Sequence, residues 1–371
     1  MTPFGLYLHI PFCRSKCIYC DFSSYPGMDR WQYAVIGKMT EELKNKSFIL
    51  GRRCASTVYV GGGTPSVLKP SLFSDLMHAA KETFPWNEDS EISVEMNPGT
   101  ITDDFLNAAR SSGVNRISLG AQSGNDRLLK RIGRIHNESD ISRAVCQLRE
   151  YGFDNYNIDM MIGLPEQTVD DVRDTLDFFM NLKPTHISCY SLIVEKGTPL
   201  YDDINRGKCD LPDEDTERDM FYTADSILEN EGYHRYEISN YAKDGFCCQH
   251  NLDCWHRCEY LGIGVAAASL IGNNRIKNPE TISAYLNGKS PEISSLTPED
   301  ERFETIMLGL RLTEGLSRID FEQKFGSDIE LVYPHVIRKL IACGLLEWHG
   351  VYLRCTARGL DLQNEVLTEF M

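Results

Sequence analysis

Near its start the chain reads Tyr7-Leu8-His9-Ile10-Pro11-Phe12-Cys13-Arg14-Ser15-Lys16-Cys17-Ile18-Tyr19-Cys20, where three cysteines at C-x3-C-x2-C spacing follow a short apolar strand. Structural zinc sites almost always use four ligands, and ferredoxin-type clusters are held by four cysteines. Three thiolates with no fourth nearby therefore favour a cubane iron–sulfur cluster whose open iron is completed by an exogenous ligand. The alternative, three unrelated buried cysteines, is disfavoured by the motifs farther along the chain.

The composition of the 371-residue chain limits its class. This length predicts one large domain and one small domain with an ample core. Thirteen cysteines, an odd number that includes a tight cluster, favour thiols and metal ligands over a disulfide scaffold, and so a reducing compartment. No basic n-region or cleavage site precedes the cysteines, and the longest nearly uncharged apolar run, Leu261 to Gly272, is shorter than the ~20 residues of a membrane span. We therefore expect a soluble, cytoplasmic protein.

The charge balance bears on the partners of the protein. There are 38 Lys and Arg residues against 54 Asp and Glu residues, which gives a formal net charge of −16. Such a charge opposes non-specific attraction to phosphate backbones. Nucleic acid is therefore not expected as a partner.

Strand-like and helical patterns alternate along the first half of the chain. The helical patterns are apolar at i+4 steps, as in Trp31, Val35, Met39 and Leu43. Strands separated by helical crossovers build a parallel sheet, and six units are too few for a closed eight-stranded barrel. The prediction is an α/β fold with an open, partial (βα)6 barrel. Its expected strands are Leu6–Ile10, Thr57–Val60, Glu91–Glu95, Arg116–Leu119, Tyr156–Met160 and His186–Leu192.

Two features stand at the ends of the second and third expected strands, where such sheets bind ligands. The second strand is followed by Gly61-Gly62-Gly63-Thr64-Pro65-Ser66, whose glycines allow close approach of the backbone to a ligand. Taken alone, this run is equally consistent with a tight turn. Glu95 ends the third strand as a carboxylate, and the alternative is a solvated charge.

The later strands deliver further polar side chains to the same end of the sheet. Gln122 and Arg134 follow the fourth strand, Asp159 lies on the fifth and Tyr190 on the sixth. Arginine offers fork geometry to a carboxylate, and glutamine offers a paired donor and acceptor. Both could bind a ribose or carboxylate, although either could also be a surface residue.

The cysteine spacing resembles that of radical S-adenosylmethionine (SAM) enzymes, and further motifs resemble those of the oxygen-independent coproporphyrinogen III oxidase superfamily. These motifs are Tyr7-x-His9-x-Pro11-Phe12-Cys13, Gly61–Ser66, Asn97-Pro98-Gly99-Thr100, Gly120-x-Gln122-Ser123, Gly133-Arg134-x-His136 and Asp159-x-x-x-Gly163-Leu164-Pro165. The resemblance implies that Cys13, Cys17 and Cys20 hold a [4Fe–4S] cluster. It also implies a set of residues around SAM, namely Tyr7, Gly62, Gly63, Thr64, Glu95, Gln122, Arg134 and Asp159.

Within that superfamily the chain resembles the heme chaperone branch. The motifs that carry this are Glu195-x-Gly197-Thr198-Pro199, Tyr236-Glu237-Ile238-Ser239-Asn240-Tyr241-Ala242 and His250-Asn251-x-x-x-Trp255. The oxidase pattern has a further cysteine two residues past Cys20, where this chain has Phe22, and a long N-terminal arm, where only twelve residues precede Cys13.

This second resemblance implies the function. It implies a chaperone that binds heme, delivers it to a recipient protein and receives electrons from a donor. The alternative is an enzyme that turns over coproporphyrinogen or another tetrapyrrole with the 5′-deoxyadenosyl radical formed from SAM. Whether the protein is an enzyme stays open at this point.

A second segment is dense in soft ligands. Between Cys247 and Cys258, four cysteines and two histidines fall within a dozen residues, which could bind a second metal or heme iron. The spacing matches no closed metal site. His250 is the favoured heme ligand, and the thiols Cys248, Cys254 and Cys258 are its rivals.

Two places in this region depart from the family pattern. The family usually has Tyr where Cys254 stands, and Gly-Ala-His-Ser where this chain reads Ala266-Ala267-Ala268-Ser269. The loss of a histidine and a glycine bears on tetrapyrrole handling more than on SAM binding.

Three domains are expected. Residues 1–240 form the partial barrel, residues 241–295 hold the His250–Trp255 motif and a linker over Ser290–Asp300, and residues 296–371 form a winged-helix-like α+β domain. Its helices are expected over Glu301–Leu312, Ile319–Phe325, Ile329–Cys343 and from Ala357, with a hairpin turn at His349-Gly350. This domain is not basic enough for a phosphate-contacting face and is expected to cover the mouth of the barrel.

Overall fold

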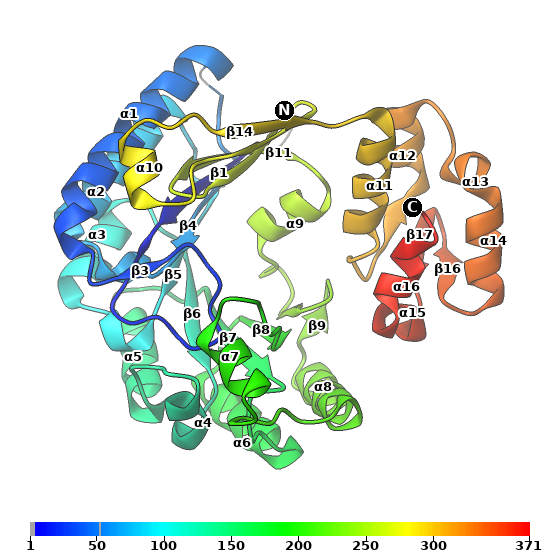
Figure 1. The fold of residues 1–371 in the computed structure, drawn as a ribbon, viewed down its shortest axis with the longest axis horizontal. Helices are drawn as coiled ribbons and strands as arrows, with labels where there is room; N and C mark the ends of the chain where they lie inside the picture. Colours follow the sequence, from blue (N-terminus) through cyan, green and yellow to red (C-terminus); the bar gives the residue numbers. More distant parts are fainter. Residues whose placement is uncertain (1–3, 52) are drawn as a thin grey trace.

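The computed structural model describes residues 4–51 and 53–371, and its centre is one mixed sheet that does not close on itself (Figure 1). All six expected strands are present, parallel and adjacent in chain order, which confirms the open α/β barrel. They are β1 (Phe4–Ile10), β4 (Thr57–Gly62), β5 (Glu91–Met96), β6 (Arg116–Gln122), β7 (Tyr156–Ile162) and β8 (His186–Ser191).

A seventh parallel strand, β11 (Glu259–Gly264), pairs with β1 on the side away from β4 and was not expected. Antiparallel strands then extend both edges of the sheet. They are β12 (Ala268–Ile271), β13 (Asn274–Lys277) and β14 (Glu292–Ser295) beyond β11, and β10 (Asn240–Ala242) and β9 (His234–Arg235) beyond β8. The stretch expected as a linker thus supplies an edge strand, and the domain boundaries at 240 and 295 stay predictions.

Helices connect the strands and pack on the outer face of the sheet (Figure 1). The i+4 pattern is confirmed for Val35, Met39 and Leu43 of α1, which are fully buried and pack in one apolar core with the side chains of β1 and β4. It is wrong for Trp31, which is 38% exposed and lies in the 3-10 turn before α1. The helices are α1 (Gln32–Leu50), α2 (Pro70–Thr83), α3 (Asp103–Ser111), α4 (Asp126–Arg131), α5 (Glu138–Glu150), α6 (Val169–Leu182), α7 (Pro199–Asn205), α8 (Glu214–Asn230) and α10 (Ile282–Leu286). Within the described residues, no helix has the length and apolar composition needed to cross a membrane.

The C-terminal region has a core of its own, built around Ile306, Phe321, Ile337 and Leu353. The expected helices and hairpin are confirmed, except that the helix over 329–343 is split in two at Pro334, because proline disfavours helical geometry in the residue before it. The elements are α11 (Pro298–Gly309), β15 (Leu316–Ser317), α12 (Arg318–Phe325), α13 (Ile329–Val332), α14 (Pro334–Ala342), β16 (Leu346–His349), β17 (Tyr352–Cys355), α15 (Ala357–Asp361) and α16 (Gln363–Thr368).

One short helix, α9 (Gln249–Trp255), lies between the sheet and α11 (Figure 1). The guanidinium of Arg311, which follows α11, lies over the ring of Trp255 at 4.5 Å, and Glu304 of α11 pairs with Arg257 at 3.0 Å. The C-terminal region therefore packs against α9 at the open side of the barrel.

Candidate functional site

A cavity of about 390 Å³ opens at the C-terminal ends of the parallel strands. It brings together ten of the twelve site residues expected from the sequence. These are Cys13, Cys17, Cys20, Gly62, Gly63, Thr64, Glu95, Gln122, Arg134 and Asp159. Tyr7 and His250 are not in its lining. Nor is any described residue after 190, and the expectation that the C-terminal region covers this mouth stays a prediction.

The cysteine loop is fixed at both ends by backbone hydrogen bonds. Its strand β2 (Phe12–Cys13) pairs with β3 (Tyr25–Pro26), and the Ile18 N–H donates to the carbonyl of Ile132 at 3.2 Å. Arg134 Nη1 donates to Cys17 Sγ at 3.4 Å, and Cys13 Sγ lies 3.4 Å from Thr64 Oγ1.

The donor set fits a cluster and not a single ion. Nowhere in residues 4–51 and 53–371 do three Cys, His, Asp or Glu side chains converge tightly enough to hold one metal ion. A cubane cluster is larger, because each thiolate binds a different iron, so three cysteines that line the same cavity suit it. In addition, the buried Arg134 Nε has no protein partner, which leaves a donor free at the cavity.

The glycine loop is required by contacts within the protein. A Cβ on Gly61 would lie 2.8 Å from the Glu95 carboxyl, one on Gly62 would lie 2.6 Å from the His9 ring, and one on Gly63 would lie 2.5 Å from the Phe12 carbonyl. Gly62 also has φ +108°, a conformation that side chains disfavour. The absence of side chains at these glycines thus allows the loop to pack closely against the cysteine loop and β5. Gly62 and Gly63 also line the cavity.

Glu95 is not a solvated charge. Its two carboxylate oxygens accept hydrogen bonds from the Tyr59 hydroxyl and the Gly62 N–H, each at 3.0 Å. Burial and the neighbouring Asp159 raise the pKa of Glu95 to about 7. Burial likewise raises the pKa of Asp159, whose Oδ1 accepts from Asn157 Nδ2 at 2.6 Å. Two buried carboxyl groups, each with a raised pKa, thus face one cavity.

Arg134 and Gln122 are positioned by backbone contacts. The second Nη of Arg134 donates to the carbonyl of Gly120, and the neighbouring His136 bonds the carbonyl of Ala121 at 3.1 Å and Asn97 Oδ1 at 3.1 Å. Gln122 has φ +72°, an uncommon conformation for a residue with a side chain, at the point where β6 ends.

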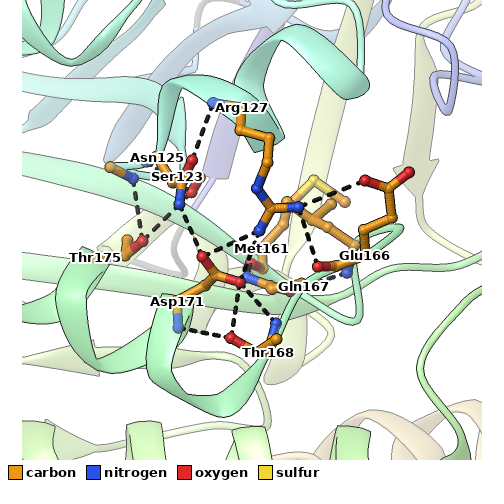
Figure 2. Close-up of polar contacts among 11 residues, drawn as sticks. Ser123, Asn125, Arg127, Met161, Glu166, Gln167, Thr168, Asp171 and Thr175 are labelled. Atoms are coloured by element: carbon orange, nitrogen blue, oxygen red, sulfur yellow. Dashed lines mark hydrogen bonds and ion pairs between the residues drawn. The ribbon is translucent and has the colours of Figure 1, made fainter.

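A polar network behind Gln122 ties the loop after β6 to the loop after β7 (Figure 2). Arg127 Nη2 donates to both oxygens of Asp171, at 3.2 and 3.0 Å, and Asn125 Nδ2 donates to the same carboxylate at 2.8 Å. Arg127 also donates to the backbone carbonyl of Glu166 at 3.2 Å. Arg127 and Asn125 thus converge on one carboxylate, which connects the segment after Gln122 to the segment after Asp159.

His250 lies at the opposite, N-terminal end of the strands. Its Nδ1 is 2.8 Å from the hydroxyl of Thr57, the first residue of β4, and the side chain is 6% exposed. Its ring stacks on Tyr59 with centroids 5.1 Å apart and on Tyr7 at 6.5 Å. Burial lowers the pKa of His250 to about 4, so the imidazole is neutral near pH 7.

The remaining soft ligands around α9 do not form a metal site among the described residues. Cys248 is buried and its Sγ donates to Glu91 Oε1 at 3.4 Å, while burial raises the pKa of Cys254 to about 12. Both groups are protonated thiols near pH 7, which disfavours them as metal ligands in this arrangement.

The sequence missed Tyr59, which lines the cavity and joins it to His250. The sequence did contain a signal for Tyr59. Alternate residues of a strand lie on the same face, so Tyr59 shares the face of β4 that carries Thr57 and Gly61. Tyr190, expected at the sixth strand end, does line the cavity.

Comparisons with known proteins agree with this geometry. The family model described as Radical SAM superfamily matches residues 7–179, and the one described as HemN C-terminal domain matches residues 296–362. The solved structure of coproporphyrinogen III oxidase (HemN) from Escherichia coli has a TM-score of 0.87 at 25% identity, covering 100% of this chain and 90% of that one.

Full-length relatives are more similar in sequence. The Heme chaperone HemW of Bacillus subtilis (strain 168) is 34% identical over 98% of this chain and 98% of its own length. The protein of that name from Lactococcus lactis is 36% identical over 100% and 97%, and that from Escherichia coli (strain K12) is 32% identical over 100% and 99%. The expected resemblance is confirmed, and with it the [4Fe–4S] cluster and SAM that define the superfamily. The chain belongs to the radical SAM superfamily and, within it, to the HemW family.

Proposed function

We propose that this protein is a heme chaperone that holds a [4Fe–4S] cluster through Cys13, Cys17 and Cys20, binds SAM beside it, and binds heme through His250 for delivery to a recipient protein. The observation that carries this proposal is the full-length similarity to relatives named Heme chaperone HemW, which spans both the cavity and α9.

The cavity supplies the groups that such a site needs. A cluster with one open iron provides a position for the amino-acid end of SAM and an electron for its reductive cleavage. Arg134 lies beside Cys17, and its Nε–H remains free to donate to a ligand. The carboxyl groups of Glu95 and Asp159 can accept hydrogen bonds from a ligand or pair with a positive charge on it. Gly62 and Gly63, which have no side chains, line the same cavity with their backbone atoms.

The imidazole of His250 suits heme iron because it is neutral near pH 7. The thiols of Cys248 and Cys254 are disfavoured as ligands by their raised pKa values. The absent family histidine, replaced here by Ala268, leaves His250 as the favoured imidazole.

The second candidate is a radical enzyme that converts coproporphyrinogen or another tetrapyrrole. The structural likeness to the oxidase from Escherichia coli favours it. Either function needs an electron donor. Since thiolate-held clusters require reducing conditions, we place the protein in the cytoplasm.

One experiment separates the two functions. The protein is reconstituted anaerobically with iron and sulfide, titrated with heme, and in parallel supplied with SAM, a reductant and coproporphyrinogen. The chaperone predicts near-stoichiometric heme binding, a heme spectrum that changes in His250→Ala, and no decarboxylated product. SAM-dependent decarboxylation without heme binding would replace the chaperone by the enzyme.

A further inference from the structure

Asp159 stands at the end of a chain of hydrogen bonds inside the barrel. It lines the cavity, and its Oδ1 accepts from Asn157 Nδ2 at 2.6 Å. The same amide nitrogen donates to the hydroxyl of Ser118 at 2.8 Å, and that hydroxyl donates to Asp159 Oδ2 at 3.4 Å. Asn157 and Ser118 are both buried, so the carboxylate is held from β6 and β7 by groups that lie within the barrel.

The next link in this chain is His186, the first residue of β8. Its Nδ1 lies 2.7 Å from Asn157 Oδ1, and its Nε2 lies 2.8 Å from the hydroxyl of Tyr236. Because the amide nitrogen of Asn157 donates to Asp159, its oxygen faces His186 as an acceptor, and Nδ1 must carry the hydrogen. Burial lowers the pKa of His186 well below its ordinary value, so the ring is neutral and its Nε2 accepts from the Tyr236 hydroxyl.

The far end of the chain is Tyr236, between β9 and β10. Its hydroxyl oxygen accepts from the backbone N–H of Cys248, the residue before α9, at 3.3 Å. Every donor in the chain therefore points toward the carboxylate, in the order Cys248, Tyr236, His186, Asn157 and Asp159. Hydrogen bonds in such a chain polarise one another, and donors aimed at a carboxylate favour its charged form.

The chain is also complete. Each side-chain nitrogen and oxygen of Asn157, His186 and Tyr236 has a hydrogen-bond partner in the described structure. Burying polar groups is costly unless all of them are satisfied, and a fully satisfied network fixes one arrangement of its members. Here the network ends at a side chain in the cavity wall, so the arrangement that it fixes includes a group available to a ligand.

We propose that Asn157, His186 and Tyr236 are positioning residues for SAM, which act by holding the carboxylate of Asp159 in place. This rests on the proposed function, in which SAM occupies the cavity and contacts Asp159. None of the three residues lines the cavity itself, so their effect on SAM passes through Asp159. The proposal also assigns a role to Tyr236, whose motif carries the resemblance to the heme chaperone branch.

The test is a calorimetric SAM titration of the cluster-loaded, full-length protein, with Asp159 present and in an Asp159→Ala background. Asn157→Leu keeps the size of the side chain and removes the donor to Asp159, so it should raise the SAM Kd roughly tenfold. Tyr236→Phe removes a hydroxyl farther along the chain and should raise the Kd about two- to fivefold. Asp159→Ala alone should raise it about ten- to a hundredfold, and in that background neither further substitution should change the Kd by more than about twofold.

The matched control is Tyr241→Phe, in the same motif as Tyr236. Tyr241 is buried, and its hydroxyl donates to Asp225 Oδ1 at 2.6 Å, outside the chain. This variant should bind SAM like its parent in both backgrounds. Asn157→Leu leaves a buried N–H of His186 without its partner, which is destabilising, so the chain is also tested in the wild type. There 15N NMR of the histidine rings should show His186 neutral, with its hydrogen on Nδ1.

The outcomes separate the chain from the proposed function. A protonated His186 ring, or one with its hydrogen on Nε2, would overturn the chain. Wild-type SAM affinity in both Asn157→Leu and Tyr236→Phe, or an equal loss with and without Asp159, would overturn the positioning role. Wild-type SAM affinity in Asp159→Ala would instead overturn the contact between SAM and Asp159 in the proposed function.

Discussion

The two ends of the parallel sheet differ in how complete they are without a ligand. At the C-terminal strand ends a cavity of about 390 Å³ is lined by thiols, two carboxyl groups and an arginine whose buried Nε has no protein partner. At the N-terminal strand ends α9 fills the space, and Glu91 and Thr57 satisfy its first turn and His250. The first end has a cavity with an unpartnered polar group, whereas the second is filled by the protein itself.

The difference matters because unpartnered buried groups are costly in the free protein. A buried donor left without a partner costs about 1–3 kcal/mol, which a correctly placed ligand recovers on binding. At α9, in contrast, Glu91 and Thr57 already supply the hydrogen-bond partners of the first helical turn and of His250. The cluster and SAM are therefore expected to bind at the first end, where the cavity already exists.

The largest effect should come from Cys17→Ser. Each thiolate of the cluster is needed, so this variant should reconstitute with little iron and sulfide. Cys254→Ser, which alters the soft-ligand segment at the other end of the sheet, should reconstitute like the wild type. Iron and sulfide analysis after anaerobic reconstitution measures both. A full cluster in Cys17→Ser and a lost one in Cys254→Ser would reverse the assignment of the two ends.

Arg134→Ala should have the next largest effect. Removal of a charge-assisted hydrogen bond costs about 1.5–3 kcal/mol, which corresponds to roughly a ten- to hundredfold loss of SAM affinity by calorimetry. The control is Arg143→Ala on α5, where an exposed arginine pairs with Asp140 at 2.8 Å. It should bind SAM normally. Unchanged SAM affinity in both variants would place SAM outside the cavity.

How far the sequence could predict this structure depended on whether the signal was local. Ligands bind at the C-terminal ends of the strands in such sheets, and each motif directly followed a recognisable strand. From this we could predict correctly that ten residues lie around one cavity. Strand β11 was missed because Gly262 and Gly264 weaken its strand signal. Gly262 is needed for a tertiary reason, since a Cβ there would lie 2.1 Å from the Ala268 carbonyl.

The position of His250 could not be predicted either. Its motif identifies a functional residue, but it does not indicate at which end of the sheet the residue lies. That position depends on hydrogen bonds to Glu91, which is more than 150 residues earlier in the chain. The placement of the C-terminal region is similar, because it depends on the contact between Arg311 and Trp255 and not on local pattern. Long-range contacts of this kind leave no periodic signal in one sequence.

A smaller effect concerns the ionisation of Glu95 in the protein without cluster or SAM. Its pKa of about 7 lies above the unfolded value of 4.5, so the folded state binds the proton more tightly. The stability this provides is complete below about pH 4.5 and is lost as the pH rises to about 7. Glutamine does not ionise, so Glu95→Gln does not lose this stability. Between these two pH values its free energy of unfolding should rise by about 2–3 kcal/mol relative to that of the wild type. Urea unfolding at several pH values measures it, with Glu88→Gln on the surface as the control; parallel curves for Glu95→Gln and wild type would contradict the raised pKa.

The smallest effect should come from Ala266→Gly at the N-terminal side of β12. Ala266 has φ +57°, the left-handed conformation that costs a side-chain-bearing residue about 1–2 kcal/mol. Glycine removes that strain but gains flexibility in the unfolded chain, which offsets about 0.4–1 kcal/mol. The net expectation is a stabilisation of about 0.5–1 kcal/mol in urea unfolding. Ala267→Gly, at a buried neighbour without positive φ, should instead be destabilising; the same loss in both variants would mean that Ala266 is not strained.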